Sequence, residues 1–341
     1  MKSQITNQAE VLVIAEIGVN HNGDVELAKQ LIDAAKCSGA DIAKFQVFRA
    51  ESLITEAAPA AEYQKKNIRE DVSHYEMLKS LELSERQFEE LADYCNQVGI
   101  EFMASGFSNE DIEVIVRLGA QRLKIPSGEI TNLPFLRAVA RHNLPAIMST
   151  GMATLDEVSE AIQALTEAGL EPRHLAILHC TTDYPTHPSD VNLRVIPMLR
   201  EELKFPVGYS DHTESTAVAG AAVAMGASLI EKHLTLDREL PGPDHRASLE
   251  PDQFSEMVAH IRAIEQAIGC PEKLPTPAEI KNRLVARKSI VASRSILRGE
   301  ILGDENLSTK RPGSGLTPML WDAICGQTAA RDYEPNELID Q

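Results

Sequence analysis

The sequence of 341 residues lacks the features that mark membrane and secreted proteins. It contains no run of about 18 apolar residues, and its start, MKSQITNQAE, does not place a basic segment before an apolar one. The sequence therefore predicts neither a membrane span nor a signal peptide. We expect a cytoplasmic protein that has no membrane partner.

Cysteine is scarce and scattered along the chain. The five cysteines are odd in number and form no C-x-x-C pair. This pattern argues against a disulfide framework and against a cysteine-based zinc site. We interpret them as small core residues: Cys37, Cys95, Cys180, Cys270 and Cys325.

Basic residues are also in deficit. The chain has 33 Lys and Arg against 51 Asp and Glu, which gives a formal net charge of −18. Such a charge repels nucleic acids and anionic membranes, so neither is expected as a nonspecific partner. One segment departs from this balance, because residues 281–311 hold eight basic side chains against three acidic ones.

Eight short apolar runs, rich in Val and Ile, alternate with segments of helical periodicity. Continuous apolar strands imply burial on both faces, and eight β-α units in about 270 residues are typical of a TIM (β/α)8 barrel. A doubly wound open sheet is the alternative. The runs span residues 11–18, 41–48, 100–107, 120–127, 145–150, 175–180, 205–211 and 226–234.

The pattern changes after residue 269. Three prolines in CPEKLPTPAEIKN predict a linker over residues 270–286. Short β-like runs and turns follow over residues 287–341, and they predict a small β-rich domain. A unit of this size buries little core alone, so we expect it to pack on a barrel, its own or a partner's.

Polar residues gather where the predicted strands end. The carboxyl ends of the strands form the active face of a TIM barrel, so these residues are candidates for a site. They include Glu16, Lys44, Gln46, Ser105, Lys124, Ser127, Glu129, Ser149, Tyr184, Ser210, Asp211, His212, Glu231 and His233.

His212 and His233 end the seventh and eighth predicted strands. These strands are neighbours in a closed barrel, so the two imidazoles could converge on one divalent ion. Two histidines with oxygen ligands suit Mn²⁺, Fe²⁺, Co²⁺ or Zn²⁺. The alternative is that each histidine only hydrogen-bonds within its own loop.

Two lysines and several serines at the strand ends offer donors for an anion. Lys44 and Lys124, with the nearby hydroxyl groups, could hold a phosphate or a carboxylate. Alternatively, the lysines pair with buried carboxylates and the serines cap the next helices. Glu16 could serve as an acid or base, or only as a structural partner of a lysine. Tyr184 could stack on a sugar or wall the site.

Ordered motifs along nearly the whole chain resemble the sialic acid synthase family, which includes N-acetylneuraminate, legionaminic acid and pseudaminic acid synthases. The motifs are EIGVNHNG, KFQVF, KIPSGE, STGMAT, HCTTDYPT, GYSDHT, EKHLTLD, PGPDHRASLEP and KRPGSG. The resemblance implies a TIM barrel followed by a small antifreeze-protein-like (SAF) domain.

The resemblance also implies a reaction. Members condense phosphoenolpyruvate with an open-chain N-acetylated amino sugar, giving a nine-carbon 2-keto acid and phosphate. It implies a divalent metal on His212 and His233, expected to be Mn²⁺, with Mg²⁺ or Co²⁺ as alternatives. The residues implied to hold phosphoenolpyruvate are Lys44, Ser105, Lys124, Ser127, Ser149 and Ser210, and those implied around the sugar and the reacting centre are Glu16, Gln46, Glu129, Tyr184 and Asp244.

Family membership further implies a domain-swapped homodimer. The small domain would cap the partner's barrel, and Arg311 would reach the N-acetyl group of the sugar. Catalytic roles are expected for Glu16, Lys44, Glu129 and Asp244. The role of Glu231 stays open, although strand alternation points it to the same side as His233.

The substrate is the least determined feature. N-acetylmannosamine, giving N-acetylneuraminate, is the leading expectation, and a 2,4-diacetamido-6-deoxy sugar, giving legionaminic acid, is the alternative. A polar pocket near Tyr63, Gln64 and Asn67 would favour the first, and an apolar wall there the second. More distant alternatives are a 3-deoxy-heptulosonate synthase and a noncatalytic sugar-binding protein.

Overall fold

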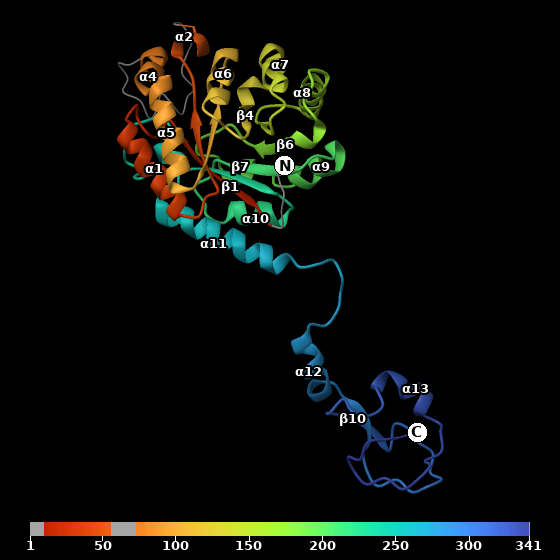
Figure 1. The fold of residues 1–341 in the computed structure, drawn as a ribbon. Helices are drawn as coiled ribbons and strands as arrows, with labels where there is room; N and C mark the ends of the chain where they lie inside the picture. The colour runs from red at the N-terminus through yellow and green to blue at the C-terminus, as the bar shows by residue number, and fades with distance from the viewer. Residues whose placement is uncertain (1–9, 56–72, 341) are drawn as a thin grey trace. The chain divides into compact units, whose positions relative to one another are not determined.

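The computed structural model describes residues 10–55 and 73–340 (Figure 1). The chain divides into two compact units, Met1–Gly269 and Cys270–Gln341, and each is described here by itself. None of the helices in the described ranges combines the length and apolar character that crossing a membrane requires.

Unit 1 is a closed barrel of eight parallel strands, with β8 hydrogen-bonded back to β1. This confirms the predicted TIM barrel, and each predicted run contains one strand. The strands are β1 (Leu12–Gly18), β2 (Ile42–Gln46), β3 (Glu101–Ser105), β4 (Leu123–Ile125), β5 (Ala146–Ser149), β6 (Leu175–Cys180), β7 (Val207–Asp211) and β8 (Leu229–His233).

Helices surround the barrel, as Figure 1 shows. Their apolar faces and the outward side chains of the strands form the main core. They are α1 (Val25–Cys37), α5 (Glu85–Val98), α6 (Asn109–Arg117), α7 (Leu133–Arg141), α8 (Leu155–Glu167), α9 (Val195–Leu203), α10 (Val218–Ala224) and α11 (Pro251–Ile268). Two shorter helices, α2 (Ala50–Leu53) and α4 (His74–Leu81), lie between β2 and α5 in the chain.

The inward side chains change character along each strand. An apolar cluster fills the amino-terminal part of the barrel interior, and it includes Ile14, Ile42, Ile147 and Leu229. Because side chains alternate between faces, the next inward positions toward the carboxyl ends are Glu16, Lys44, Ser149 and Glu231. The strands therefore close the bottom of the barrel with hydrocarbon and present polar groups at its mouth.

Close packing inside the barrel explains Gly208 on β7. A Cβ atom there would lie 2.6 Å from Leu178 Cδ2 and 2.7 Å from the Leu229 Cβ atom. Such contacts are too short for carbon atoms, so β6 and β8 can flank β7 at this level only if position 208 has no side chain.

Unit 2 contains α12 (Pro277–Ala286), β9 (Ser289–Ala292), β10 (Leu307–Lys310) and α13 (Trp321–Ile324). β9 and β10 pair antiparallel over a small apolar core, and Trp321 packs against that core. We interpreted the three prolines at the start of this unit as a linker signal over residues 270–286, but Pro277 begins α12. Proline is tolerated at the first helical position, and Thr276 caps the helix through the backbone N–H of Glu279.

Candidate active site

A cavity of about 300 Å³ lies at the carboxyl ends of the barrel strands. Residues from all eight strand ends and the loops that follow them meet there, although they are far apart in the sequence. Of the residues singled out from the sequence, those that line it are Lys44, Gln46, Ser105, Lys124, Ser127, Ser149, Tyr184, Ser210, His212, Glu231, His233 and Asp244.

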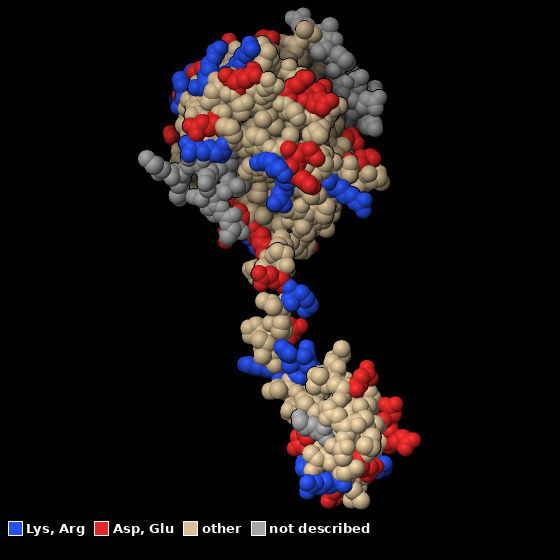
Figure 2. All heavy atoms as spheres, turned by 90° about the vertical axis from the view of Figure 1, so that its right-hand side faces the viewer, with Lys and Arg blue, Asp and Glu red and all other residues tan. Residues whose placement is uncertain are grey.

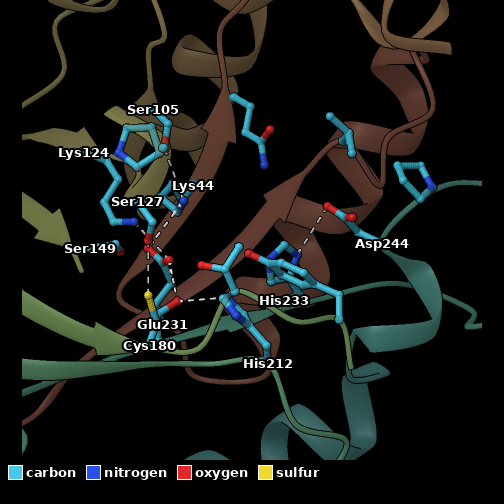
Figure 3. A pocket seen from close by; sticks show the side chains of 18 of the residues that line it. Lys44, Ser105, Lys124, Ser127, Ser149, Cys180, His212, Glu231, His233 and Asp244 are labelled. Atoms are coloured by element: carbon cyan, nitrogen blue, oxygen red, sulfur yellow. Dashed lines mark hydrogen bonds and ion pairs between the residues drawn. The ribbon is translucent and has the colours of Figure 1, made fainter. Parts of the chain in front are cut away.

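A cluster of buried charges forms the floor of the cavity (Figure 3). Lys44 Nζ lies 2.6 Å from Glu16 Oε2 and 3.4 Å from Glu231 Oε2. Lys124 Nζ lies 3.2 Å from Glu231 Oε1. The lysines therefore pair with buried carboxylates, and the same ammonium groups also face the cavity. The sequence offered two alternatives for these lysines, an anion site or structural pairing with carboxylates, and the geometry is compatible with both.

The cluster shifts the pKa values of its members. Burial opposes the charge on Lys44, but Glu16 and Glu231 outweigh it and raise the pKa of this lysine. Burial raises the pKa of Glu16, although Lys44 opposes that effect. Burial would also raise the pKa of Glu231, yet Lys124 and Lys44 hold it well below its usual range. Glu231 is thus a carboxylate at neutral pH.

Hydroxyl groups and a backbone N–H surround the lysines. Ser127 Oγ accepts a hydrogen bond from the Gly151 N–H at 3.0 Å and lies 3.3 Å from Cys180 Sγ. Ser149 Oγ is buried and has no hydrogen-bond partner. A buried hydroxyl group without a partner is costly, so this group is poised for a ligand atom. Lys44 Nζ also donates to Ser105 Oγ at 3.4 Å.

His212 and His233 lie beside each other, with ring centroids 5.6 Å apart. The Nδ1–H of His212 donates to the Thr181 carbonyl oxygen at 2.6 Å, which leaves Nε2 as the lone-pair nitrogen. Burial lowers the pKa of His212 to about 4 and that of His233 well below its usual value. Both rings are therefore neutral near pH 7.

These two histidines fit the divalent metal that the resemblance implies. The buried Nδ1 of His233 has no hydrogen-bond partner, and the backbone carbonyl of Thr181 fixes the tautomer of His212 in the way metal-binding histidines are held. The described ranges contain no group of three or more His, Cys, Asp or Glu that could hold a metal ion. A divalent ion held by two imidazoles would keep positions open for substrate or water.

Asp244 and Tyr184 complete this side of the cavity. Asp244 Oδ2 lies 3.9 Å from His233 Nδ1, and burial and the charge of Glu16 raise the pKa of Asp244 to about 7. The ring of Tyr184 lies over His212, with centroids 4.1 Å apart. Tyr184 therefore walls the histidine side of the cavity.

Two predicted catalytic residues do not line the cavity. Glu16 lies behind its floor and acts on it through Lys44 and through Gln46, whose Nε2 donates to Glu16 Oε1 at 2.9 Å. Glu129 lies on the 3-10 turn after β4, where its Oε2 accepts from Asn132 Nδ2 at 2.5 Å. The turn directs Glu129 toward the start of α7, so its catalytic role stays a prediction.

Two further expectations concern residues away from the barrel mouth. Arg311 belongs to unit 2, where it is exposed. Tyr63, Gln64 and Asn67 lie outside the described residues. The expected contacts of these residues with the sugar stay predictions.

Several cavity residues were missed by the sequence analysis. Cys180 was interpreted as a core residue, but its thiol lines the cavity beside Ser127. Its inward position at the end of β6 was a usable signal. An apolar wall comes from Val19, Met77, Leu78, Leu81 and Phe107. No motif pointed to this wall, because apolar residues on an amphipathic helix are the ordinary signal of a core.

The side chains of Asp211 and Lys232 point outward from the barrel, away from the cavity. We counted Asp211 among the strand-end candidates, but strand alternation turns it outward, where its Oδ2 lies 3.0 Å from Lys232 Nζ. Both side chains are fully buried. Lys232 also donates to the Thr213 carbonyl oxygen, and the Thr213 N–H donates to Asp211 Oδ1 at 2.9 Å. The pair thus secures the loop that carries His212.

Comparisons with known proteins give two family matches and several similar relatives. The NeuB family model matches residues 31–273, and the SAF domain model matches residues 287–341. The chain is 44% identical over 330 residues to an N,N'-diacetyllegionaminic acid synthase of Campylobacter jejuni, covering 97% of this chain and 99% of the relative. It is 47% identical over 316 residues to the enzyme of the same name from Legionella pneumophila, covering 92% and 89%.

A solved structure supports the same assignment. The N-acetylneuraminic acid (sialic acid) synthetase of Leptospira borgpetersenii, crystallised in complex with citrate, superposes with a TM-score of 0.72 at 32% identity. The match covers 80% of this chain and 90% of that one. The family model spans well over half of the chain, and all of the ordered motifs except KRPGSG contribute residues to one cavity. The chain therefore belongs to the NeuB family, the family of sialic acid and related nonulosonic acid synthases.

Proposed function

We propose that this protein condenses phosphoenolpyruvate with open-chain 2,4-diacetamido-2,4,6-trideoxymannose to give N,N'-diacetyllegionaminic acid and phosphate. The observation that carries the proposal is one cavity in which an anion-binding floor adjoins a pair of neutral histidines. Identities of 44% and 47% to two legionaminic acid synthases favour this acceptor over N-acetylmannosamine, our leading expectation from the sequence. The match to the N-acetylneuraminic acid synthetase is weaker, at 32%.

Phosphoenolpyruvate would occupy the floor of the cavity. Its carboxylate and phosphate would be bound by Lys44, Lys124 and the hydroxyl groups of Ser105, Ser127, Ser149 and Ser210. The free hydroxyl of Ser149 and the two ammonium groups support this placement. Glu231 contacts both ammonium groups, and its negative charge would keep them charged before the ligand binds.

The acceptor sugar would lie toward His212, His233 and Asp244, with Gln46 and Tyr184 beside it. A divalent metal, proposed to be Mn²⁺ and held by His212 and His233, would supply Lewis-acid polarisation of the aldehyde. C3 of phosphoenolpyruvate then forms the new bond to the aldehyde carbon, whose oxygen takes up a proton. Water adds at C2 and loses one proton, which balances the proton taken up by the aldehyde oxygen. The C2–O bond to phosphate then breaks as the C2 hydroxyl gives its remaining proton to the departing phosphate and becomes the keto group. Asp244, which lines the cavity, would transfer these protons, and Glu16 would act on the site through Lys44.

One assay tests both the reaction and the metal. The purified protein is incubated with phosphoenolpyruvate and either sugar, after chelation or with added Mn²⁺, while phosphate release and product mass are followed. We expect phosphate and the mass of N,N'-diacetyllegionaminic acid, with turnover lost on chelation and restored by Mn²⁺. Absence of phosphate with both sugars would refute the synthase, and chelator-insensitive turnover would refute the metal role. Turnover of N-acetylmannosamine but not of the diacetamido sugar would show that the protein is an N-acetylneuraminate synthase instead.

We also propose that the protein is a homodimer in which unit 2 of one chain caps the partner's barrel, so that Arg311 binds the sugar. The supporting observations are the SAF match and a local cluster of exposed basic side chains at α12. Figure 2 shows Lys and Arg side chains gathered over α12. The exposed basic residues in and beside this helix are Lys281, Arg283, Arg287 and Lys288.

The test of this contact uses two neighbouring residues. Arg311→Ala is expected to raise the KM for the sugar about tenfold, which is the usual effect of losing one charge-assisted hydrogen bond, without changing the KM for phosphoenolpyruvate. Lys310→Ala serves as the control, because Lys310 bonds to Asn336 within unit 2. Equal sugar kinetics in both variants, or a monomer by light scattering, would contradict the cross-subunit contact.

A further inference from the structure

The cavity has two chemically different parts. Its floor is built from the charged and hydroxyl groups at the strand ends. One wall is instead built from Val19, Met77, Leu78, Leu81 and Phe107, which we call the apolar wall. Every side chain that α4 contributes to the cavity lining among the described residues is hydrocarbon or thioether.

The apolar wall is firmly built. Ser73 caps α4 in a reciprocal capping box with Glu76, and this fixes where the helix begins. Met77, Leu78 and Leu81 then lie on the buried face of the helix and pack in one cluster with Val19 and Phe48. These five side chains are at most 8% exposed, whereas Phe107 is half-buried at the edge of the cluster.

The position of the apolar wall relative to the cavity floor indicates which end of the acceptor sugar contacts the wall. The floor residues and His233 belong to the strands themselves, whereas Val19 and Phe107 follow β1 and β3 and α4 stands beyond β2. The aldehyde must lie at the histidine side, where bond formation occurs. The carbon chain of the acceptor therefore runs outward from the floor, and its last carbon, C6, is the atom farthest from the reacting centre.

We propose that the apolar wall receives C6 of the acceptor and selects sugars that carry a methyl group there over sugars that carry a hydroxymethyl group. This inference rests on the proposed function and names the residues that set its substrate class. A methyl group gains from leaving water against hydrocarbon, whereas a hydroxyl group there loses its hydrogen bonds to water without replacement. Apolar pockets discriminate against an added hydroxyl group by about 10² in kcat/KM.

The experiment compares two acceptors that differ by one oxygen atom. These are 2,4-diacetamido-2,4,6-trideoxymannose and its 6-hydroxy counterpart, 2,4-diacetamido-2,4-dideoxymannose. The wild-type protein is expected to prefer the 6-deoxy sugar by about 10–100-fold in kcat/KM. A preference below about threefold would overturn the proposal, because a wall that contacts C6 must distinguish the two sugars.

Three variants assign the preference to the wall. Met77→Gln supplies an amide of similar volume, and Phe107→Tyr, at a half-buried position, supplies a hydroxyl group if the first variant does not fold. Either change is expected to reduce the preference about tenfold without changing the KM for phosphoenolpyruvate. Met77→Leu is the matched control and keeps the preference, because it conserves volume and polarity. Thermal unfolding of each variant checks the fold.

The outcomes separate this proposal from the proposed function. Turnover of both sugars with an unchanged ratio in Met77→Gln and Phe107→Tyr would overturn the apolar wall as the selecting element and leave the synthase intact. Lack of phosphate release from both sugars in the wild-type protein would instead refute the synthase reaction itself.

Discussion

Strands β7 and β8 carry buried ion pairs on both sides of the barrel wall. On the inside, Glu231 pairs with Lys44 and Lys124 at the floor of the cavity. On the outside, Asp211 pairs with Lys232 in a space that is fully buried between the strands and the surrounding helices. The inner lysines line the cavity, where the proposed substrate would bind. Asp211 and Lys232 do not line the cavity, so we expect this pair to contribute to stability and to the position of the loop.

A buried ion pair therefore contributes differently at the cavity floor and on the outer side of the strands. Desolvation makes such a pair expensive, and its net contribution to folding is often near zero. At that cost, the inner cluster would hold charge ready for the proposed anionic substrate. The outer pair holds the backbone of Thr213, next to His212. We expect substitutions inside to change mainly catalysis, and substitutions outside to change mainly stability.

The largest effect is expected for Lys124→Met. This change removes an ammonium group from the proposed phosphoenolpyruvate site and leaves Lys44 to pair with Glu231. We expect kcat/KM for phosphoenolpyruvate to fall by about 10³, because fixed charges at a reacting anion have effects of this size. Phosphate release measures it, with circular dichroism as the control for folding. A loss smaller than tenfold would mean that the inner cluster is structural like the outer one.

Lys232→Met should have a large effect on the free energy of unfolding and only a small effect on the catalytic activity. The change leaves Asp211 charged, buried and without its cation, which typically costs about 3–5 kcal/mol in the free energy of unfolding. Urea unfolding of unit 1 measures the loss. Activity per folded molecule should exceed that of Lys124→Met. A stability equal to that of the wild-type protein would contradict the assignment of Asp211 as an ionised partner.

The double variant Asp211→Asn with Lys232→Met should recover much of this loss. The amide oxygen at position 211 can still accept from the Thr213 N–H, and no unpaired charge remains. We expect the double variant to lie within about 2 kcal/mol of the wild-type protein. A double-mutant cycle, completed by Asp211→Asn alone, gives the coupling energy. Additive losses would show that the two side chains act independently.

The smallest effect is expected at a surface pair. Lys29 lies 2.8 Å from Glu26 and 2.6 Å from Glu90, closer to its partners than Lys232 is to Asp211. Water screens the exposed charges, so Lys29→Met should leave the midpoint of thermal unfolding unchanged within error. A decrease as large as that of Lys232→Met would show that distance matters more than burial.

Much of the site followed from local sequence patterns. Alternation along β8 placed Glu231 and His233 on one side, and the strand order placed His212 beside them. The same rule should have turned Asp211 outward, but we grouped residues only by their position at strand ends. Glu129 shows the remaining limit, because the direction of a side chain after a strand depends on the turn that follows.

The sequence by itself determined the barrel, the small second unit and the polar strand ends, because apolar runs, helical periodicity and alternation are properties of neighbouring residues. Only the tertiary structure decided which groups touch. Lys124 and Glu231 are separated by 107 residues and meet because the barrel closes. Met77 and Leu81 resemble any helix core in the sequence, and they line the cavity because α4 stands beside Val19. Contacts of this kind depend on the closure of the whole barrel, which no local pattern encodes.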